Sequence, residues 1–344
     1  MANEEAITEK VEQPDRPGFF TRLKRREARA RDRAAATDSH RPIRWRLFRR
    51  IFGVVVVAVA LYYPAGMIAV HKIDDDTAFA PAAEPGQSRA VAMMAGLLTR
   101  EIERHGWTAN DPFFLPSSQL DNMPNYQTGI VAALARFTIE MADHIGRART
   151  NANPDPDLER ARELLSYAGT VWVFSFKTWS AEPPSEQQYL AARDALLAYN
   201  KRLAGKKAVF DRRAPKLQAT LARITTDVGG IAGELEARVT EAGGAIVDTR
   251  SDDVFYAAKG RIYAYYLVLR ALGEDYARTI QEKQLEKAWP QMLASLKQAA
   301  EIKPFIVRNG NPSGFLQPNH LATQGFYLLR ARSQMLEIAG ILLK

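Results

Sequence analysis

Two polar, turn-rich stretches carry the side chains best suited to chemistry. Residues 111–136 read "DPFFLPSSQLDNMPNYQTGIVAALAR", and residues 303–332 read "KPFIVRNGNPSGFLQPNHLATQGFYLLRAR". Asparagine offers both a donor and an acceptor, which suits neutral polymers or peptides better than ionic substrates. The candidate polar surface comprises Asp121, Asn122, Asn125, Tyr126, Asn309, Asn311, Asn319 and His320. The alternative is structural, because Asn is also the usual residue of turns and helix caps.

The two stretches use the same parts in the same order. Each runs from Pro-Phe through a turn-rich loop to Pro-Asn, then Thr, Gly and an amphipathic helix. Pro124 and Pro318 disfavour helix at the preceding residue, so Asn125 and Asn319 are predicted to cap the helices that follow. We interpret the stretches as a pseudo-repeat whose loops flank one surface; chance resemblance of two capped loops is the alternative.

Other positions of this alignment refine the prediction. Gly129 and Gly325 are expected to let another backbone approach, since glycine has no Cβ. His320 corresponds to Tyr126, which weakens any claim that imidazole chemistry is required at that position.

A second candidate is the aromatic stretch "RSDDVFYAAKGRIYAYYLVLRAL" at residues 250–272. Its Tyr256, Tyr263 and Tyr266 would suit stacking against sugar rings or peptide side chains. The competing interpretation is core packing with phenolic tips that reach polar partners.

Standard catalytic signatures are absent from the sequence. It has no Walker loop, no G-x-G-x-x-G, no H-E-x-x-H and no cysteine.

The stretch "NANPDPDLER" resembles a calcium loop only superficially. It is better interpreted as the start of a helix, in which Asp155 is the cap and Pro156 lies in the first turn. We therefore expect no metal, no cofactor and no reaction that motifs can identify.

The positive charge gathers in one segment. The chain holds 47 Lys and Arg against 39 Asp and Glu, and residues 1–50 hold 14 and 8 of these. Residues 51–70, "IFGVVVVAVALYYPAGMIAV", carry no charge and have the length that a membrane-spanning helix needs. The basic residues that precede this stretch, and that we expect at the membrane surface, are Arg41, Arg44, Arg46, Arg49 and Arg50.

By the positive-inside rule, this arrangement predicts a cytoplasmic N-terminus and a C-terminal part outside the cytoplasm. A cleaved signal peptide is disfavoured by the 50-residue leader, and a buried strand or core helix by the flanking arginines. Nucleic-acid binding is not expected, because no aromatic platform or known fold accompanies the arginines. The lipid bilayer is the expected partner of this segment.

The remaining chain shows helical periodicity with hardly any strand alternation. Helices are expected at about residues 88–105, 130–145, 156–179, 184–204, 214–242, 253–272, 274–302 and 320–343. The stretch "AGTVWVFSFKTW" at 168–179 is compatible with either a helix or a strand, and we favour a helix. Residues 214–242 are compatible with one bent helix or with two helices. The predicted fold class is all-α: an N-terminal transmembrane helix followed by a bundle of about eight helices.

The predicted organisation has four parts: a basic cytoplasmic head at 1–50, the transmembrane helix at 51–70, a loose linker at 71–87, and a periplasmic helical domain at 88–344.

The chain resembles a bacterial, chiefly proteobacterial, family of unknown function. The resemblance rests on "NDPFFLPSSQLDNMPNYQTGI" with "ALARF", on "FYAAKGRIYAYYLVLRAL" and on "NGNPSGFLQPNHLATQ", and it spans about residues 50–344. Pro318 stands where the family usually has a small residue. The resemblance implies a single-pass, membrane-anchored envelope protein of the bacterial inner membrane, and it implies no reaction.

Two functions remain open. The first is a non-enzymatic binding or scaffolding module, tethered to the membrane, that binds another envelope protein or a cell-wall component. The second is an enzyme acting on cell-wall glycan or peptide through a cleft between the 111–129 and 308–325 loops. The sequence leaves the oligomeric state open.

Overall fold

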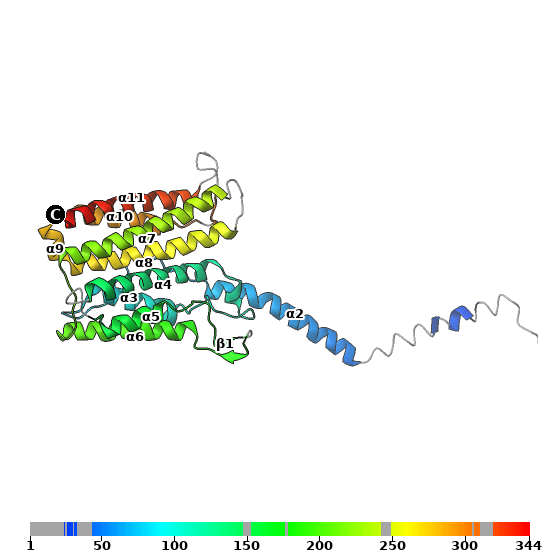
Figure 1. Ribbon diagram of the computed structural model, residues 1–344. Helices are drawn as coiled ribbons and strands as arrows, with labels where there is room; N and C mark the ends of the chain where they lie inside the picture. Colours follow the sequence, from blue (N-terminus) through cyan, green and yellow to red (C-terminus); the bar gives the residue numbers. More distant parts are fainter. Residues whose placement is uncertain are drawn as a thin grey trace, which may run out of the picture. The chain divides into compact units, whose positions relative to one another are not determined.

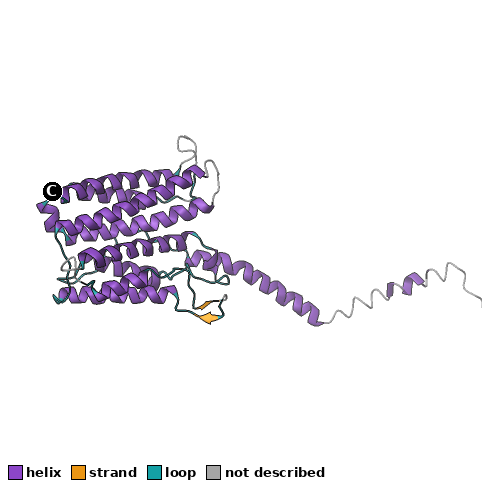
Figure 2. Cartoon of the chain, in the orientation of Figure 1, coloured by secondary structure: helices purple, strands orange, loops and turns teal. Residues whose placement is uncertain are grey.

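The computed structural model describes residues 24, 26–29, 31–32, 43–146, 153–175, 178–241, 249–304, 306–309 and 319–344. The chain forms two compact units, Met1–Leu61 and Tyr62–Lys344. The described residues are almost entirely helical, which confirms the predicted all-α class (Figure 2).

Helix α2 spans Ile43–Val70. Its Leu47–Val70 stretch is long and apolar enough to cross a membrane, and none of its most apolar part is buried by protein. This agrees with the span predicted at 51–70. Arg49 and Arg50 are exposed on the same helix. Arg41 and the side chains of Arg44 and Arg46 lie outside the described residues.

Helices of the second unit run side by side as a bundle (Figure 1). Helix α8 is central, since α3, α4 and α10 all pack on it, while α7 pairs with α11 and α5 with α6. The helices are α3 Arg89–Thr99, α4 Asn122–Glu140, α5 Pro156–Leu165, α6 Ser185–Ala204, α7 Ala214–Glu241, α8 Thr249–Asp275, α9 Ala277–Glu282, α10 Ala288–Ala300 and α11 His320–Leu342. Single π-turns, Arg100–Arg104 and Met141–Ile145, extend α3 and α4.

Several helix boundaries follow from the predicted capping chemistry. Asp155 accepts a hydrogen bond from Asp157 N, and Pro156 occupies the first turn of α5. Asn319 accepts from Ala322 N, so it caps α11 as predicted. Helix α7 is one continuous helix, which decides between the two alternatives for that segment.

Two predicted helices were wrong in their extent. The segment 156–179 leaves the helix at Leu165, and its aromatic part enters a short hairpin, β1 Phe174–Ser175 paired with β2 Ser180–Ala181. Its β-branched and aromatic residues favour extended backbone, and Gly169 ends the helical periodicity. The segment 274–302 is divided into α9 and α10, with Gln284 at a left-handed φ of 56° between them.

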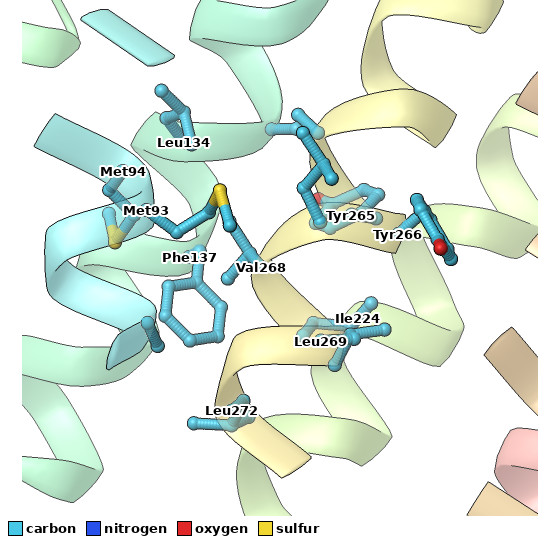
Figure 3. Close-up of a cluster of buried hydrophobic side chains, with 14 of the residues drawn as sticks. Met93, Met94, Leu134, Phe137, Ile224, Tyr265, Tyr266, Val268, Leu269 and Leu272 are labelled. Atoms are coloured by element: carbon cyan, nitrogen blue, oxygen red, sulfur yellow. The ribbon is translucent and has the colours of Figure 1, made fainter. Parts of the chain in front are cut away.

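The core is continuous through the bundle. Figure 3 shows Phe137 of α4 beside Met93 and Met94 of α3 and Val268 of α8. Each large side chain that is fully buried in this way contributes about 1.5–3 kcal/mol to stability. Helices α4 and α8 approach each other closely at two glycines: an ideal Cβ on Gly129 would lie 2.3 Å from Ala257 O, and one on Gly260 would lie 2.0 Å from Tyr126 O.

Candidate functional site

The first polar loop meets the beginning of α8. Asn125 Nδ2 donates to Asp253 Oδ1 over 2.7 Å. With its amide nitrogen turned toward the carboxylates, Asn122 donates to Asp252 Oδ2 over 2.7 Å and lies 3.3 Å from Asp121 Oδ1. Three carboxyl groups and two amides are therefore gathered where α4 and α8 begin.

Burial and the closeness of these carboxyl groups raise the pKa values of Asp252 and Asp253. Burial raises the pKa of Asp252 to about 6, and the Asp121 carboxylate adds to the rise, while the bond from Asn122 opposes it. Burial and Asp121 also raise the pKa of Asp253, against the bond from Asn125. A carboxyl that titrates near pH 6 can exchange a proton close to neutrality, but structural networks produce such shifts as well.

The second polar loop meets the same end of α8. Asn309 Nδ2 donates to Arg238 O over 2.9 Å and lies 3.4 Å from Ser251 Oγ. Asn319 Nδ2 donates to Asn309 Oδ1 over 2.8 Å, and the two residues form an antiparallel bridge. Asn311 lies outside the described residues.

The two loops therefore converge on consecutive residues, since Ser251 contacts the second loop while Asp252 and Asp253 contact the first. Sequence reasoning identified the asparagines but missed these α8 partners. Their signal was the run "SDD" at a helix start, where carboxylates favour the positive end of the helix dipole. We call the set Asp121, Asn122, Asn125, Ser251, Asp252, Asp253, Asn309 and Asn319 the polar junction.

Two candidate surface residues have other roles. Tyr126 is fully buried, and its hydroxyl donates to Asp74 O over 2.9 Å. His320 is half-buried; Arg308 N donates to its Nδ1 over 3.0 Å, and burial, followed by the Arg308 charge, lowers its pKa. Neither side chain contributes to the polar junction, and the predicted surface was wrong at Tyr126, which is fully buried.

The pseudo-repeat is not exact in structure. Asp121, not Asn125, caps α4, and Pro124 lies inside the first turn, where its missing N–H has no intrahelical partner to lose. The close approach predicted at Gly129 is confirmed, whereas a Cβ on Gly325 would meet nothing within 4 Å. The two loops thus differ in where their helices begin and in what those helices pack against.

A second network fixes the segment between α2 and α3, which we call the strap, residues 71–88. Asp75 is buried and accepts from Lys259 Nζ over 2.8 Å and from Lys303 Nζ over 2.6 Å. Burial opposes the charged carboxylate, yet the two ammonium groups outweigh burial and lower the pKa of Asp75. Lys259 also donates to Ile302 O over 2.6 Å, and burial lowers its pKa against the effect of Asp75.

Backbone carbonyls of the strap receive further donors. Arg100 Nη2 donates to Asp74 O over 3.0 Å, Tyr263 Oη donates to Asp76 O over 2.7 Å, and Arg270 donates to Thr77 O and Phe79 O. The strap is thus bound to α3, α4, α8 and the segment after α10, in contrast to the loose linker expected from its composition.

The candidate aromatic helix serves this network and the core. Tyr263 is buried and accepts from Arg100 Nη1 over 2.7 Å. Tyr266 is buried with the Arg270 guanidinium 5.7 Å from its ring centroid. Tyr256 is half-buried, and burial followed by Asp252 raises its pKa to about 12. An exposed stacking surface at Tyr263 and Tyr266 was therefore a wrong expectation.

Sequence reasoning missed the charged residues of the strap network. Lys259 falls on the apolar stripe of α8 with Phe255, Ile262 and Tyr263, and Arg100 follows the apolar run of α3. A charge on a buried face requires a partner, because burying an isolated ion is costly. That spacing was the available signal, although it does not identify Asp75 as the partner.

The grooves on the surface of the described part of the chain include two that lie away from the first polar loop. One, of about 290 Å³, runs between α7 and α11 and includes Leu321 and Gly325 with apolar neighbours; the other, of about 250 Å³, lies between α5 and α6 around Asp157 and Arg160. Neither contains a residue of the 111–129 loop, so neither is the cleft predicted between the two loops. Among the described residues, no group of three or more His, Cys, Asp or Glu side chains is arranged to hold a metal ion.

Comparison with known proteins gives one match. The model of a family described as "Uncharacterized protein conserved in bacteria (DUF2333)" matches residues 68–250 and 247–344. No curated protein and no solved structure matches the chain.

Proposed function

The chain belongs to this family of uncharacterized bacterial proteins, and from that premise we propose that it is a non-enzymatic, membrane-tethered binding or scaffolding protein of the cell envelope. Its anchor is α2. The Leu47–Val70 stretch exposes valine, leucine and isoleucine side chains along its length. Exposed apolar area of this kind costs about 25 cal/mol per Å² in water, and a bilayer core removes that cost.

The strap is the observation that carries the proposal. A body that only needs to remain near a membrane can be joined to its anchor by a flexible chain. Here Asp75 is held between two lysines, and four carbonyls of the strap accept bonds from the bundle. This attachment begins directly after α2, so the strap is part of the body, and this supports a body held close to its anchor rather than one at the end of a flexible chain.

The charge pattern supports an orientation for the anchor. Arginines precede the uncharged stretch 51–70 of α2, whereas Asp74, Asp75 and Asp76 follow soon after it. The positive-inside rule then favours a cytoplasmic N-terminus and a body on the periplasmic side of the inner membrane.

Binding is favoured over catalysis by the way in which the polar junction uses its side chains. Asn122 and Asn125 bond to carboxylates of α8, and Asn309 and Asn319 bond to each other and to the helix ends. These bonds join helices and leave the amides engaged. The proposed partner is another envelope protein or a cell-wall component.

The test is topological and uses the full chain. Alkaline phosphatase fused after Lys344 should be active, because that enzyme matures outside the cytoplasm, while a fluorescent protein that matures only in the cytoplasm should stay dark at the same position. The reverse pattern would overturn the orientation. Recovery of the unfused chain in the soluble fraction would overturn the anchor itself.

The binding role has a separate test. Crosslinking in intact cells, with the full chain at its native level, should trap one recurrent envelope component. Its capture should persist when the Leu47–Val70 sequence is replaced by an unrelated membrane-spanning helix. Capture of no component, or of a set that changes with the replaced helix, would argue against a binding body.

A further inference from the structure

Aromatic side chains, several of them exposed, gather on the 112–116 loop and on residues 172–181, which include the β1–β2 hairpin. Phe113 is 73% exposed and Trp179 is 78% exposed. The ring centroids of Phe113 and Phe114 lie 5.5 Å apart, and those of Phe114 and Trp172 lie 5.8 Å apart. We call Phe113, Phe114, Trp172 and Trp179 the aromatic rim.

The rim is held in place by polar contacts behind it. Asn110 Nδ2 donates to Val171 O over 2.8 Å, which joins the chain just before the two segments, and to Glu186 Oε2 of α6 over 2.5 Å. Trp179 has a left-handed φ of 53°, a conformation that costs a bulky residue free energy. The Trp179 ring is therefore exposed to solvent, although both the backbone conformation of this residue and its exposed apolar surface are unfavourable in free energy.

The rim adjoins the last turns of α2. Tyr63 Oη donates to Phe113 O over 3.1 Å, and an ideal Cβ on Gly66 would lie 2.3 Å from Pro116 Cγ. Tyr63, Gly66 and Val70 are partly covered, whereas Tyr62 and Ile68 on other faces of the helix stay exposed. The loop therefore lies against one side of the 62–70 part of the helix, while Tyr62 and Ile68 stay exposed.

This contact places the loop at membrane depth, provided that α2 spans the bilayer as proposed. Tyr63 lies seven residues before Val70, the end of the apolar stretch. At about 1.5 Å per residue, that separation is about 10 Å along the helix. A group beside Tyr63 then lies in the outer part of the bilayer rather than in the water beyond it.

We propose that the aromatic rim inserts into the outer leaflet of the bilayer that holds α2. The body would then contact the lipid surface directly, in addition to being connected to its anchor. The chemistry of both segments fits lipid. Residues 112–120 carry no charge, and residues 171–181 carry one, Lys177. Tryptophan and tyrosine favour the membrane–water interface, and phenylalanine favours the boundary between the lipid headgroups and the acyl chains.

The absence of cysteine from the sequence makes a direct test possible. Phe113→Cys, Trp179→Cys, Val57→Cys and Leu343→Cys are made singly in the full chain, labelled with an environment-sensitive fluorophore and reconstituted in phosphatidylethanolamine–phosphatidylglycerol vesicles. Nitroxide-labelled lipids then report contact with acyl chains. Val57 lies in the apolar stretch of α2, and Leu343 is an exposed residue at the far end of α11 from the polar junction.

Labels at positions 113 and 179 should be quenched severalfold more than the label at 343, with blue-shifted emission. If position 57 is quenched while 113 and 179 match 343, the rim does not dock and the anchor proposal stands. If position 57 is not quenched, the anchor proposal fails. Labels at 113 and 179 that are shielded from aqueous iodide yet unaffected by lipid nitroxides would instead assign the rim to a protein contact and overturn lipid docking.

Discussion

Lys259 Nζ lies 2.8 Å from Asp75 Oδ2, and the two side chains are only 2% and 7% exposed. Asp75 belongs to the strap that follows α2, and Lys259 lies in the middle of the bundle's central helix. The pair therefore joins the segment nearest the candidate membrane helix to the core of the body. Since each charge is buried, the loss of either partner leaves the other without its main compensation.

The first prediction concerns this pair. Lys259→Met keeps the volume but leaves Asp75 buried with only Lys303, so the free energy of unfolding should fall by about 3 kcal/mol. Lys303→Ala is the matched control, because it removes the other ammonium, whose side chain is 66% exposed, and should cost about 1 kcal/mol or less. Urea unfolding of the detergent-solubilised full chain, followed by circular dichroism, measures both. Equal effects of the two substitutions would show that burial does not decide the strength of this contact.

The second prediction concerns the close crossing of α4 and α8. Gly260→Ala places a methyl group against the Tyr126 carbonyl, which is backbone and cannot rotate away, so the substitution should destabilise the fold by about 3 kcal/mol or more. Gly325→Ala in α11 meets open space and should be neutral or stabilising by up to about 1 kcal/mol, because alanine is the better helix former. Thermal unfolding distinguishes the two, and a stable Gly260→Ala variant would show that α4 and α8 can separate without loss of stability.

The helical architecture was predictable because it depends on local signals. Asp155 with Pro156, and Asn319 before α11, are capping patterns that the structure confirms. The hairpin near Phe174 was missed because its strands are two residues long, and such short strands give no periodicity to read.

The contacts that bind the strap were not predictable in the same way. Asp75 and Lys259 are separated by more than half of the bundle's sequence, and a single sequence does not show which distant charges meet. Composition suggested a flexible linker because "DDDTAFAPAAEPG" is rich in acids, alanine and proline. The segment is ordered instead because its carbonyls have donors, such as Arg100 and Arg270, that lie far away in the chain.

The third prediction concerns pH. The pKa of Asp252 is raised from its ordinary value of 3.8 to about 6 in the folded protein, so between these values the folded state binds more protons than the unfolded state. Stability therefore falls as pH rises from about 4 to 6, and the loss is complete above 6. Asp252→Asn removes the charge and keeps an acceptor for Asn122, so it should stabilise the protein at pH 7 by about 1 kcal/mol, a value reduced because the carboxyl is only half-buried.

Melting temperatures of the wild type and Asp252→Asn across pH 4 to 7.5 measure this effect. The two curves should meet at the acidic end and diverge with rising pH. Asp121→Asn should reproduce part of the gain, because the Asp121 charge contributes to the shift. Curves that stay parallel would show that the carboxyl titrates normally and that the polar junction leaves it hydrated.

The fourth prediction concerns the orientation of α2. Insertion of a single apolar helix is directed mainly by basic residues close to its ends, and here five arginines stand on the N-terminal side against Lys72 on the other. Replacement of Arg49 and Arg50 by glutamine removes the two nearest charges but leaves Arg41, Arg44 and Arg46, so most chains should keep their orientation. Replacement of all five, together with two lysines introduced after Val70, should reverse the bias. The ratio of phosphatase to fluorescence signal from C-terminal fusions should then fall severalfold. An unchanged ratio would mean that the folded bundle, rather than the arginines, determines which end of the chain crosses the membrane.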